Sequence, residues 1–244
     1  MSAPIILSPR RFGRLLAADA MNVARDPIMP LAIIMCLVPA IALRLFGGSM
    51  DSAAEAAFGL PDLSRYVAAI ALVIPAGLLG WVAGFLLLED RDEGTLLAID
   101  VTPVGKQGFL AYRVSATALA AVALTLYNCW LAIPGLTIPT MLLLCVVVAC
   151  NAVAAAVILP AFARNKVEGL ALTKLTNLVI LLPLIAAIPS PLRFFGGILP
   201  SYWVGELLGL PATPLPLAVA APLAIAVNVA AVALLFGWFG RRAG

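Results

Sequence analysis

The chain has 244 residues, of which 64% are hydrophobic and only 11% charged, and it contains no histidine. A soluble globular domain is normally about a quarter charged and about half apolar, so the composition indicates a membrane protein. The missing histidine excludes Ser-His-Asp and Cys-His catalysis, and the formal net charge of +3 gives no support for binding a nucleic acid.

The N-terminal segment 8–25 is predicted to form an amphipathic helix. Ser8 is a good helix cap and Pro9 suits the first helical position. At about 100° per residue, apolar side chains such as Phe12 fall opposite four arginines, although Asp19 interrupts the apolar side. This pattern is typical of a helix in the membrane interface, with its arginines toward anionic headgroups or a partner. A simple basic anchor before the first span is the alternative.

Six membrane spans are predicted from the uncharged runs of the chain, because about 20 residues of helix cross the hydrocarbon core. The longest uncharged run, between Arg113 and Arg164, is interrupted at Pro134 and Gly135, which favour a tight hairpin between two spans. Within a single membrane domain covering residues 1–244, we therefore expect spans at 28–46, 66–88, 113–133, 137–163, 174–190 and 214–239.

The positions of the basic residues predict how these spans are oriented. Twelve of the fifteen Lys and Arg residues precede the first span, follow the second or fourth, or end the chain. The positive-inside rule places those segments, both termini included, in the cytoplasm. The connection 89–108 is then cytoplasmic, and the connection 191–213 lies outside.

The cytoplasmic connection 89–108 carries the densest charge of the sequence. It holds five of the twelve acidic residues, and Gly94 separates most of them from a short apolar segment that ends at Thr102 and Pro103. We expect a short helix bounded by turns. Acidic side chains on an otherwise basic membrane face favour docking of a basic protein surface. A magnesium site and a solvated charge run are the alternatives.

Four asparagines lie within the predicted spans: Asn128, Asn151, Asn177 and Asn228. Polar groups in a membrane face the bundle interior, so these side chains could line a transport pathway. Hydrogen bonding between neighbouring helices is the more common role of such residues. No acidic or basic residue lies deep in a predicted span, which disfavours transport coupled to protons or sodium ions.

The outer connection 191–213 is interrupted by Gly196, Gly197 and Pro200 before Tyr202 and Trp203. Aromatic residues favour the headgroup level of the membrane. Short re-entrant or interfacial helices are therefore predicted in this region.

Taken in order, these motifs resemble the permease subunits of ABC-2 type transporters, a family of type V exporter-like fold, and in particular those labelled fluoroquinolone exporters. The resemblance is carried by residues 88–96 and 101–103 after the second span, 164–169 after the fourth, and 199–203 before the sixth. Together with the six-span layout, it covers nearly the whole chain.

The resemblance implies that 8–25 is a connecting helix along the membrane surface and that 89–103 contains a coupling helix, which seats in a separate ATP-binding subunit. Two copies of that subunit and a second permease, identical or related, would complete the transporter, with ATP and Mg bound by the ATPase and no cofactor bound by this chain. Consistently, the sequence has no GxxxxGK[ST] phosphate loop. The residues implied in ATPase coupling are Glu89, Asp90, Arg91, Asp92, Glu93, Gly94, Thr95, Leu96, Thr102 and Pro103.

Two further regions take roles from the resemblance. A second contact, with the ATPase or with the coupling helix, is implied for Asn165, Lys166, Glu168 and Gly169, although an ordinary connection between helices is the alternative. The region of Tyr202 and Trp203 would cap the outer end of the pathway as part of an outer gate.

The sequence thus predicts an all-α permease of the bacterial inner membrane that exports a small amphipathic compound or drug, powered by a partner. It would not be an enzyme by itself. Two alternatives remain: an integral membrane enzyme that modifies lipids by using the acidic cluster with magnesium, and a non-transporting assembly or sensor subunit.

Overall fold

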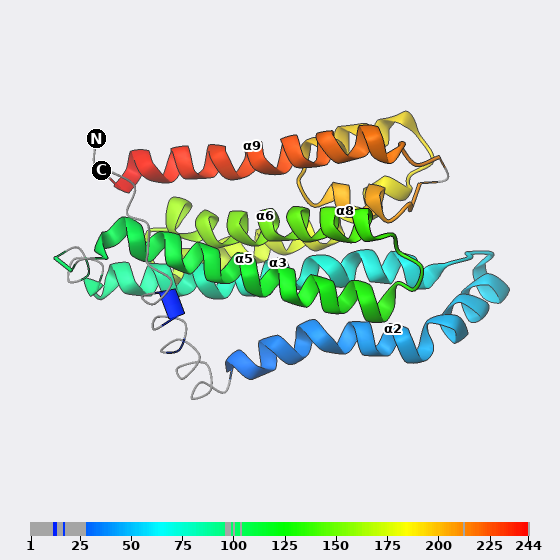
Figure 1. Ribbon diagram of the computed structural model, residues 1–244, viewed down its shortest axis with the longest axis horizontal. Coiled ribbons are helices and arrows are strands. Elements are labelled where there is room, and N and C mark those ends of the chain that lie inside the picture. The colour runs from blue at the N-terminus through cyan, green and yellow to red at the C-terminus, as the bar shows by residue number, and fades with distance from the viewer. Residues whose placement is uncertain are drawn as a thin grey trace.

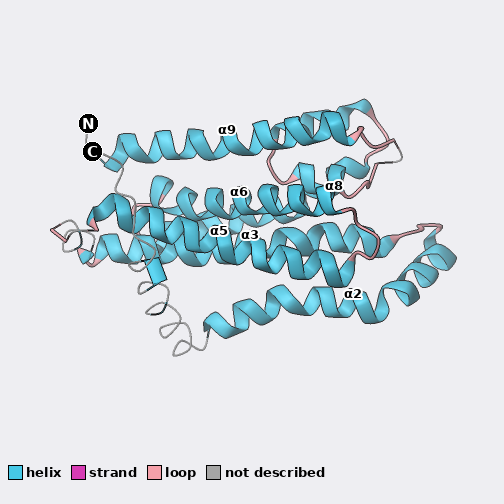
Figure 2. Ribbon diagram, in the orientation of Figure 1, coloured by secondary structure: helices cyan, strands magenta, loops and turns pink. Residues whose placement is uncertain are grey.

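The computed structural model describes residues 12–13, 17, 28–95, 99, 101–102, 104–211 and 213–243, and this part of the chain contains helices and no strands (Figures 1 and 2). Six helical segments are long and apolar enough to cross a membrane, which confirms the prediction of an all-α protein with six spans. Most of the predicted interfacial helix 8–25 lies outside the described residues, as do Leu96 and Pro103 of the predicted coupling region.

The helices follow one another along the chain with short connections (Figure 1). In chain order they are α2 (Ile28–Phe58), α3 (Leu63–Asp92), α5 (Gly105–Ala132), α6 (Ile138–Phe162), α7 (Lys166–Thr176), the 3-10 segments η1 (Asn177–Ala187) and η2 (Pro191–Ile198), α8 (Tyr202–Leu207) and α9 (Leu217–Ala243).

Several elements differ in extent from the predicted spans. Helix α2 continues twelve residues beyond 46 to Phe58, because residues 49–58 are rich in alanine and contain no proline. Residues 89–92 and 105–108 of the predicted loop belong to α3 and α5, so the connection itself covers 93–104. The fifth span combines α7 with η1, in which Pro183 lacks the amide donor that a regular α-helix requires.

The first two long helices are joined by a tight hairpin. The carboxylate of Asp51 in α2 accepts hydrogen bonds from the backbone amide and the hydroxyl of Ser64, each at 2.7 Å. These bonds satisfy a donor in the first turn of α3 that has no partner within the helix. The α2–α3 hairpin is therefore fixed by a polar contact at its tip.

Helices α3 and α6 form the centre of the bundle, with α2 and α9 at its opposite edges (Figure 1). Gly80 and Gly84 let the two central backbones approach closely. A Cβ atom on Gly80 would lie 2.7 Å from the carbonyl oxygen of Ala152, and one on Gly84 would lie 3.0 Å from that of Ala156. Small residues at such positions are the usual basis of helix packing in membranes.

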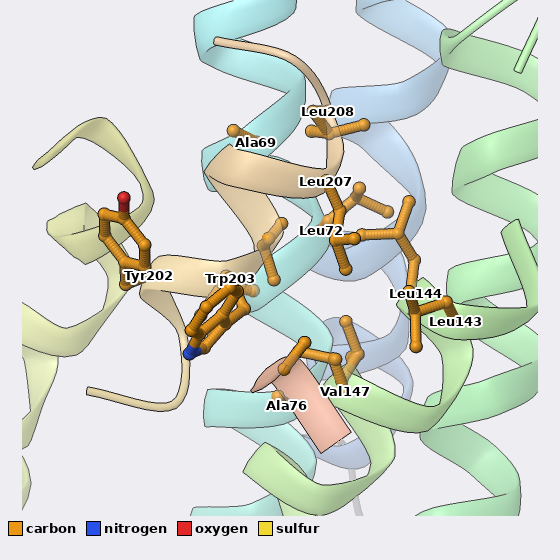
Figure 3. Packing of buried hydrophobic residues seen from close by; sticks show 14 of the residues in the cluster. Ala69, Leu72, Ala76, Leu143, Leu144, Val147, Tyr202, Trp203, Leu207 and Leu208 are labelled. Atoms are coloured by element: carbon orange, nitrogen blue, oxygen red, sulfur yellow. The ribbon is translucent and has the colours of Figure 1, made fainter. Parts of the chain in front are cut away.

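The short helix α8 is buried inside one end of the bundle along its whole length. Figure 3 shows Leu207 of α8 beside Leu72 of α3 and Leu144 of α6, within the main apolar cluster. Segments η1 and η2 pack around α8 and complete this end. We call it the α8 end. The other end, where α3 meets the 93–104 connection and α6 meets α7, is called the charged end.

Candidate functional site

Four of the predicted coupling residues, Glu89–Asp92, form the last turn of α3 at the charged end. The Lys166 ammonium, at the start of α7, donates to Glu89 Oε1 at 2.6 Å. Asp90 pairs with Arg113 of α5, with 3.5 Å between Oδ2 and Nη2 and both side chains largely buried. The last turn of α3 is thus tied to the two helices that follow it at this end.

Arg91 makes the densest contact of the charged end. Its guanidinium donates to the carbonyl oxygens of Pro160 at 3.3 Å, Ala163 at 3.0 Å and Arg164 at 2.8 Å. Carbonyls at the C-terminal end of a helix lack donors within that helix, and their partial negative charge favours a cation. Arg91 therefore caps α6 from α3, a role that the sequence pattern did not indicate.

The second predicted contact region, residues 165–169, packs against this same cluster. Asn165 caps α7 by accepting the Glu168 amide at 2.9 Å, and the Glu168 carboxylate accepts the Arg164 amide at 2.8 Å. Gly169 lies against α3, because a Cβ atom there would be 2.9 Å from Leu88 Cδ1. The structure thus brings residues 165–169 together with the end of α3.

The connection after α3 opens with a conformation that requires glycine. Gly94 has a φ of +73°, in the left-handed region, and its amide donates to the Arg91 carbonyl at 3.2 Å. Asp92 and Glu93 are exposed and Thr95 is half-buried. Near the end of the connection, the exposed Thr102 hydroxyl donates to the Ile99 carbonyl at 2.7 Å. The exposed acids at this end are therefore accessible to a partner.

The four asparagines occupy different environments. Asn151 of α6 donates to the carbonyl of Val147 at 2.8 Å and to Asn228 Oδ1 of α9 at 2.9 Å. Asn177 is exposed at the start of η1. Asn128 of α5 is 1% exposed, and neither side-chain polar atom has a hydrogen-bond partner among the described residues. The structure therefore brings only Asn151 and Asn228 together.

The α8 end holds two buried charged residues that no sequence motif indicated. Glu206 is 2% exposed and accepts the Tyr202 hydroxyl at 2.9 Å and the Leu215 amide at 2.8 Å. Arg193 is 7% exposed and donates to the Thr213 carbonyl at 2.7 Å. These contacts hold the segment before α9, at Thr213 and Leu215, against η2 and α8.

Tyr202 and Trp203, predicted as part of an outer gate, are both buried in this end. Burial, and then the hydrogen bond to the Glu206 carboxylate, raise the pKa of the Tyr202 hydroxyl above its ordinary value. The indole of Trp203 donates to the Gly197 carbonyl at 3.0 Å. The isolation of Glu206 in an otherwise apolar segment could have indicated from the sequence that this residue is unusual. The sequence could not have indicated which residues it contacts.

Comparison with known proteins adds evidence that covers most of the chain. A family model described as "Fluoroquinolones export permease protein Rv2686c-like" matches residues 19–236. Two relatives from Mycobacterium tuberculosis, the fluoroquinolones export permease proteins Rv2686c (strain ATCC 25618 / H37Rv) and MT2760 (strain CDC 1551 / Oshkosh), are each 26% identical over 209 residues. That alignment covers 82% of this chain and 82% of each relative. No solved structure matches. The six apolar segments and the extent of the family match together confirm the resemblance to drug-export permeases: the chain belongs to the Rv2686c-like family of fluoroquinolone export permeases.

Proposed function

We propose that this chain is the membrane-spanning subunit of an ATP-driven exporter that moves a small amphipathic compound of the fluoroquinolone class out of the cytoplasm. Membership of the permease family and the names of the two relatives support the substrate class. The sequence contains no GxxxxGK[ST] phosphate loop, so the energy would come from a separate ATP-binding subunit. The complete transporter would contain two such subunits, which bind ATP and Mg, and a second permease.

The observation that carries the coupling mechanism is the network at the charged end. Arg91 joins the last turn of α3 to the end of α6, and Lys166 joins it to α7. Because α3 and α6 are the two central helices, a displacement applied to the 93–104 connection would move the core of the bundle rather than a loose loop.

The exposed acids next to this network supply a surface for docking. Asp92 and Glu93 face solvent at the end of α3, beside the turn that Gly94 makes possible. We infer that this surface meets basic residues of the ATPase, since complementary charge fixes the register of two protein surfaces. The charged end then faces the cytoplasm of a bacterial inner membrane, with both chain termini on that side.

The experiment is drug-stimulated ATP hydrolysis by the reconstituted complex with Glu93→Lys or Gly94→Val. The first change reverses a charge in the docking surface, and the second forces a β-branched residue into a left-handed conformation. Both variants should insert into the membrane but lose the stimulation. Glu55→Lys, which reverses an exposed charge near the end of α2 far from the charged end, is the matched control and should behave as the wild type.

Two results would contradict the proposal. One is full drug-stimulated hydrolysis in both the Glu93 and the Gly94 variants, which would remove the coupling role of the connection. The other is modification of a phospholipid by the purified chain without any ATPase, which would favour a membrane enzyme instead.

A further inference from the structure

A cavity of about 370 Å³ lies between α3, α6, η1 and α9. It exists because α9 packs mainly on α6 while η1 packs on α3 and α8. Trp81, Ile158 and Leu235 line the part toward the charged end, and Leu199 and Pro200 line the part toward the α8 end. The cavity therefore begins near the middle of the spans and extends toward the charged end.

The walls of the cavity are apolar except near Asn151. Both amide hydrogens of Asn151 are used, since Nδ2 donates to the Val147 carbonyl and to Asn228 Oδ1. Its Oδ1 atom accepts no hydrogen bond from the described residues, because both bonds of the Asn151 amide run through Nδ2. The cavity thus offers one hydrogen-bond acceptor at mid-membrane depth, where water is scarce and an unpaired polar atom is costly.

We propose that this cavity, within a single permease, is the site that holds the transported compound. The flat apolar body of the compound would lie against Trp81, and a hydrogen-bond donor on it would bind Asn151 Oδ1. The volume is within the range of sites for small molecules, roughly 300–1,000 Å³. The inference rests on the proposed export function and adds to it the place and chemistry of binding.

The chemistry of the cavity favours this occupant over two others. The acyl chain of a phospholipid has no hydrogen-bond donor, so it would leave Asn151 Oδ1 unsatisfied. A helix of a second permease, about 10 Å in diameter, does not fit, because one turn of it occupies roughly 420 Å³ and the cavity holds about 370 Å³. A small compound with flat rings and at least one N–H or O–H group satisfies both the apolar wall and the acceptor.

The end of the cavity toward α8 is closed by a hydrogen-bonded chain. Asn151 donates to Asn228 at 2.9 Å, and Asn228 in turn donates to the Pro200 carbonyl at 3.3 Å. Asn228 is completely buried. A bound compound is therefore separated from the outer side until Leu199 and Pro200 move away. The acceptor that the compound would use, on Asn151, belongs to the same residue that holds Asn228 against the Pro200 carbonyl.

The test is Gly77→Leu, which fills the cavity from α3. A Cβ atom on Gly77 would meet only the ring of Trp81 within 4 Å, with the nearest atom at 3.6 Å, so the helix accepts a side chain there. Binding of a fluoroquinolone to the purified permease should weaken by about tenfold or more, because the leucine side chain fills space that the compound would occupy. Gly48→Leu, on an exposed part of α2 with nothing within 4 Å, is the matched control and should bind as the wild type.

Tryptophan fluorescence provides a second readout. A fluoroquinolone should quench part of the emission of the wild type, and Trp81→Phe should lose that part while thermal unfolding shows the fold intact. Quenching that a phospholipid reproduces and that the drug does not displace would assign the cavity to an acyl chain and overturn the proposal.

The site and the function can fail separately. If vesicles containing the wild-type complex transport a fluoroquinolone and Gly77→Leu transports it with unchanged KM, the site is wrong and the function stands. If the wild-type complex neither binds nor transports the drug, the proposed substrate class is wrong, and the site proposal falls with it.

Discussion

At the scale of single residues, Arg91 is a side chain of α3 that stabilises the end of a second helix, α6. It lies in the last turn of α3 and supplies donors to three carbonyls at the end of α6 and just after it. Lysine keeps the positive charge but replaces the planar fork of five donors with a single ammonium, which cannot reach all three oxygens.

We expect Arg91→Lys to reduce the free energy of unfolding by about 0.5–1.5 kcal/mol, the usual net contribution of hydrogen bonds that are only partly shielded from water. The measurement is thermal unfolding of the purified protein in detergent. Arg65→Lys, which changes an exposed arginine near the start of α3, is the control and should leave the transition unchanged. Equal transitions for both variants would show that Arg91 does not stabilise the charged end.

Tyr202→Phe tests the buried network at the α8 end. Removing the hydroxyl leaves Glu206 Oε2 without its donor, so we expect a loss of about 1–3 kcal/mol of stability at neutral pH. The raised pKa of Tyr202 adds a second signature. Above pH about 10 the unfolded chain loses this proton while the folded chain keeps it, so wild-type stability falls as pH rises.

The variant should lack that contribution, so the gap between wild type and Tyr202→Phe should shrink as the pH rises above about 10. Thermal unfolding at neutral and alkaline pH measures both effects. A constant gap across this range would mean that Tyr202 titrates as an ordinary exposed tyrosine does.

The contacts of these residues could be predicted from the sequence only in part. The positions of Glu89 and Lys166 near the ends of spans could be predicted from charge and hydropathy, but their 2.6 Å contact joins residues 77 positions apart. The burial of Glu206 follows from the path of the segment before α9, which no local pattern encodes. Local sequence patterns therefore predict where a charged residue lies along a span, but they do not predict which distant residue it contacts.

At the scale of elements, the number of spans followed from the lengths of apolar runs, because a helix must be about 20 residues long to cross the membrane. The irregular 3-10 conformation within the fifth span could not be predicted from the length of its apolar run. Residues 177–187 form a 3-10 segment that contains Pro183, and Gly205 of α8 lies against the Pro183 carbonyl. This packing depends on a helix that follows later in the chain.

The contact between α3 and α6 gives a prediction at this scale. Gly80→Ala places a methyl group against the Ala152 carbonyl and Ala155, so the two central helices must separate. We expect a loss of about 1–3 kcal/mol, typical of overpacking. Gly77→Ala, three residues earlier on the same helix, meets only Trp81 at ordinary contact distance and should be at least as stable as the wild type, because alanine favours a helix more than glycine does. Equal stability of the two variants would show that the close approach at Gly80 is not required.

At the scale of the whole molecule, most lysines and arginines of the described helices lie at one end of the bundle. Arg113, Arg164 and Lys166 lie at the charged end with the acids of α3, whereas the tip of the α2–α3 hairpin and the 133–137 turn lie at the other. The sequence predicted this separation from the distribution of arginine and lysine alone, since the positive-inside rule needs only the order of spans.

The orientation of the bundle gives the last prediction. In a variant whose four native cysteines are replaced, a single cysteine at Asp62, exposed in the α2–α3 hairpin, should react in intact cells with a maleimide that cannot cross membranes. A single cysteine at Glu168, exposed on α7, should react only after the inner membrane is permeabilised. The expectation follows from the positive-inside rule, because Arg164 and Lys166 lie at the α6–α7 connection, whereas residues 59–62 of the hairpin contain no lysine or arginine. Labelling of Glu168→Cys, but not of Asp62→Cys, in intact cells would indicate the opposite orientation of the bundle. The exposed acids of α3 would then lie where no cytoplasmic ATPase could reach them.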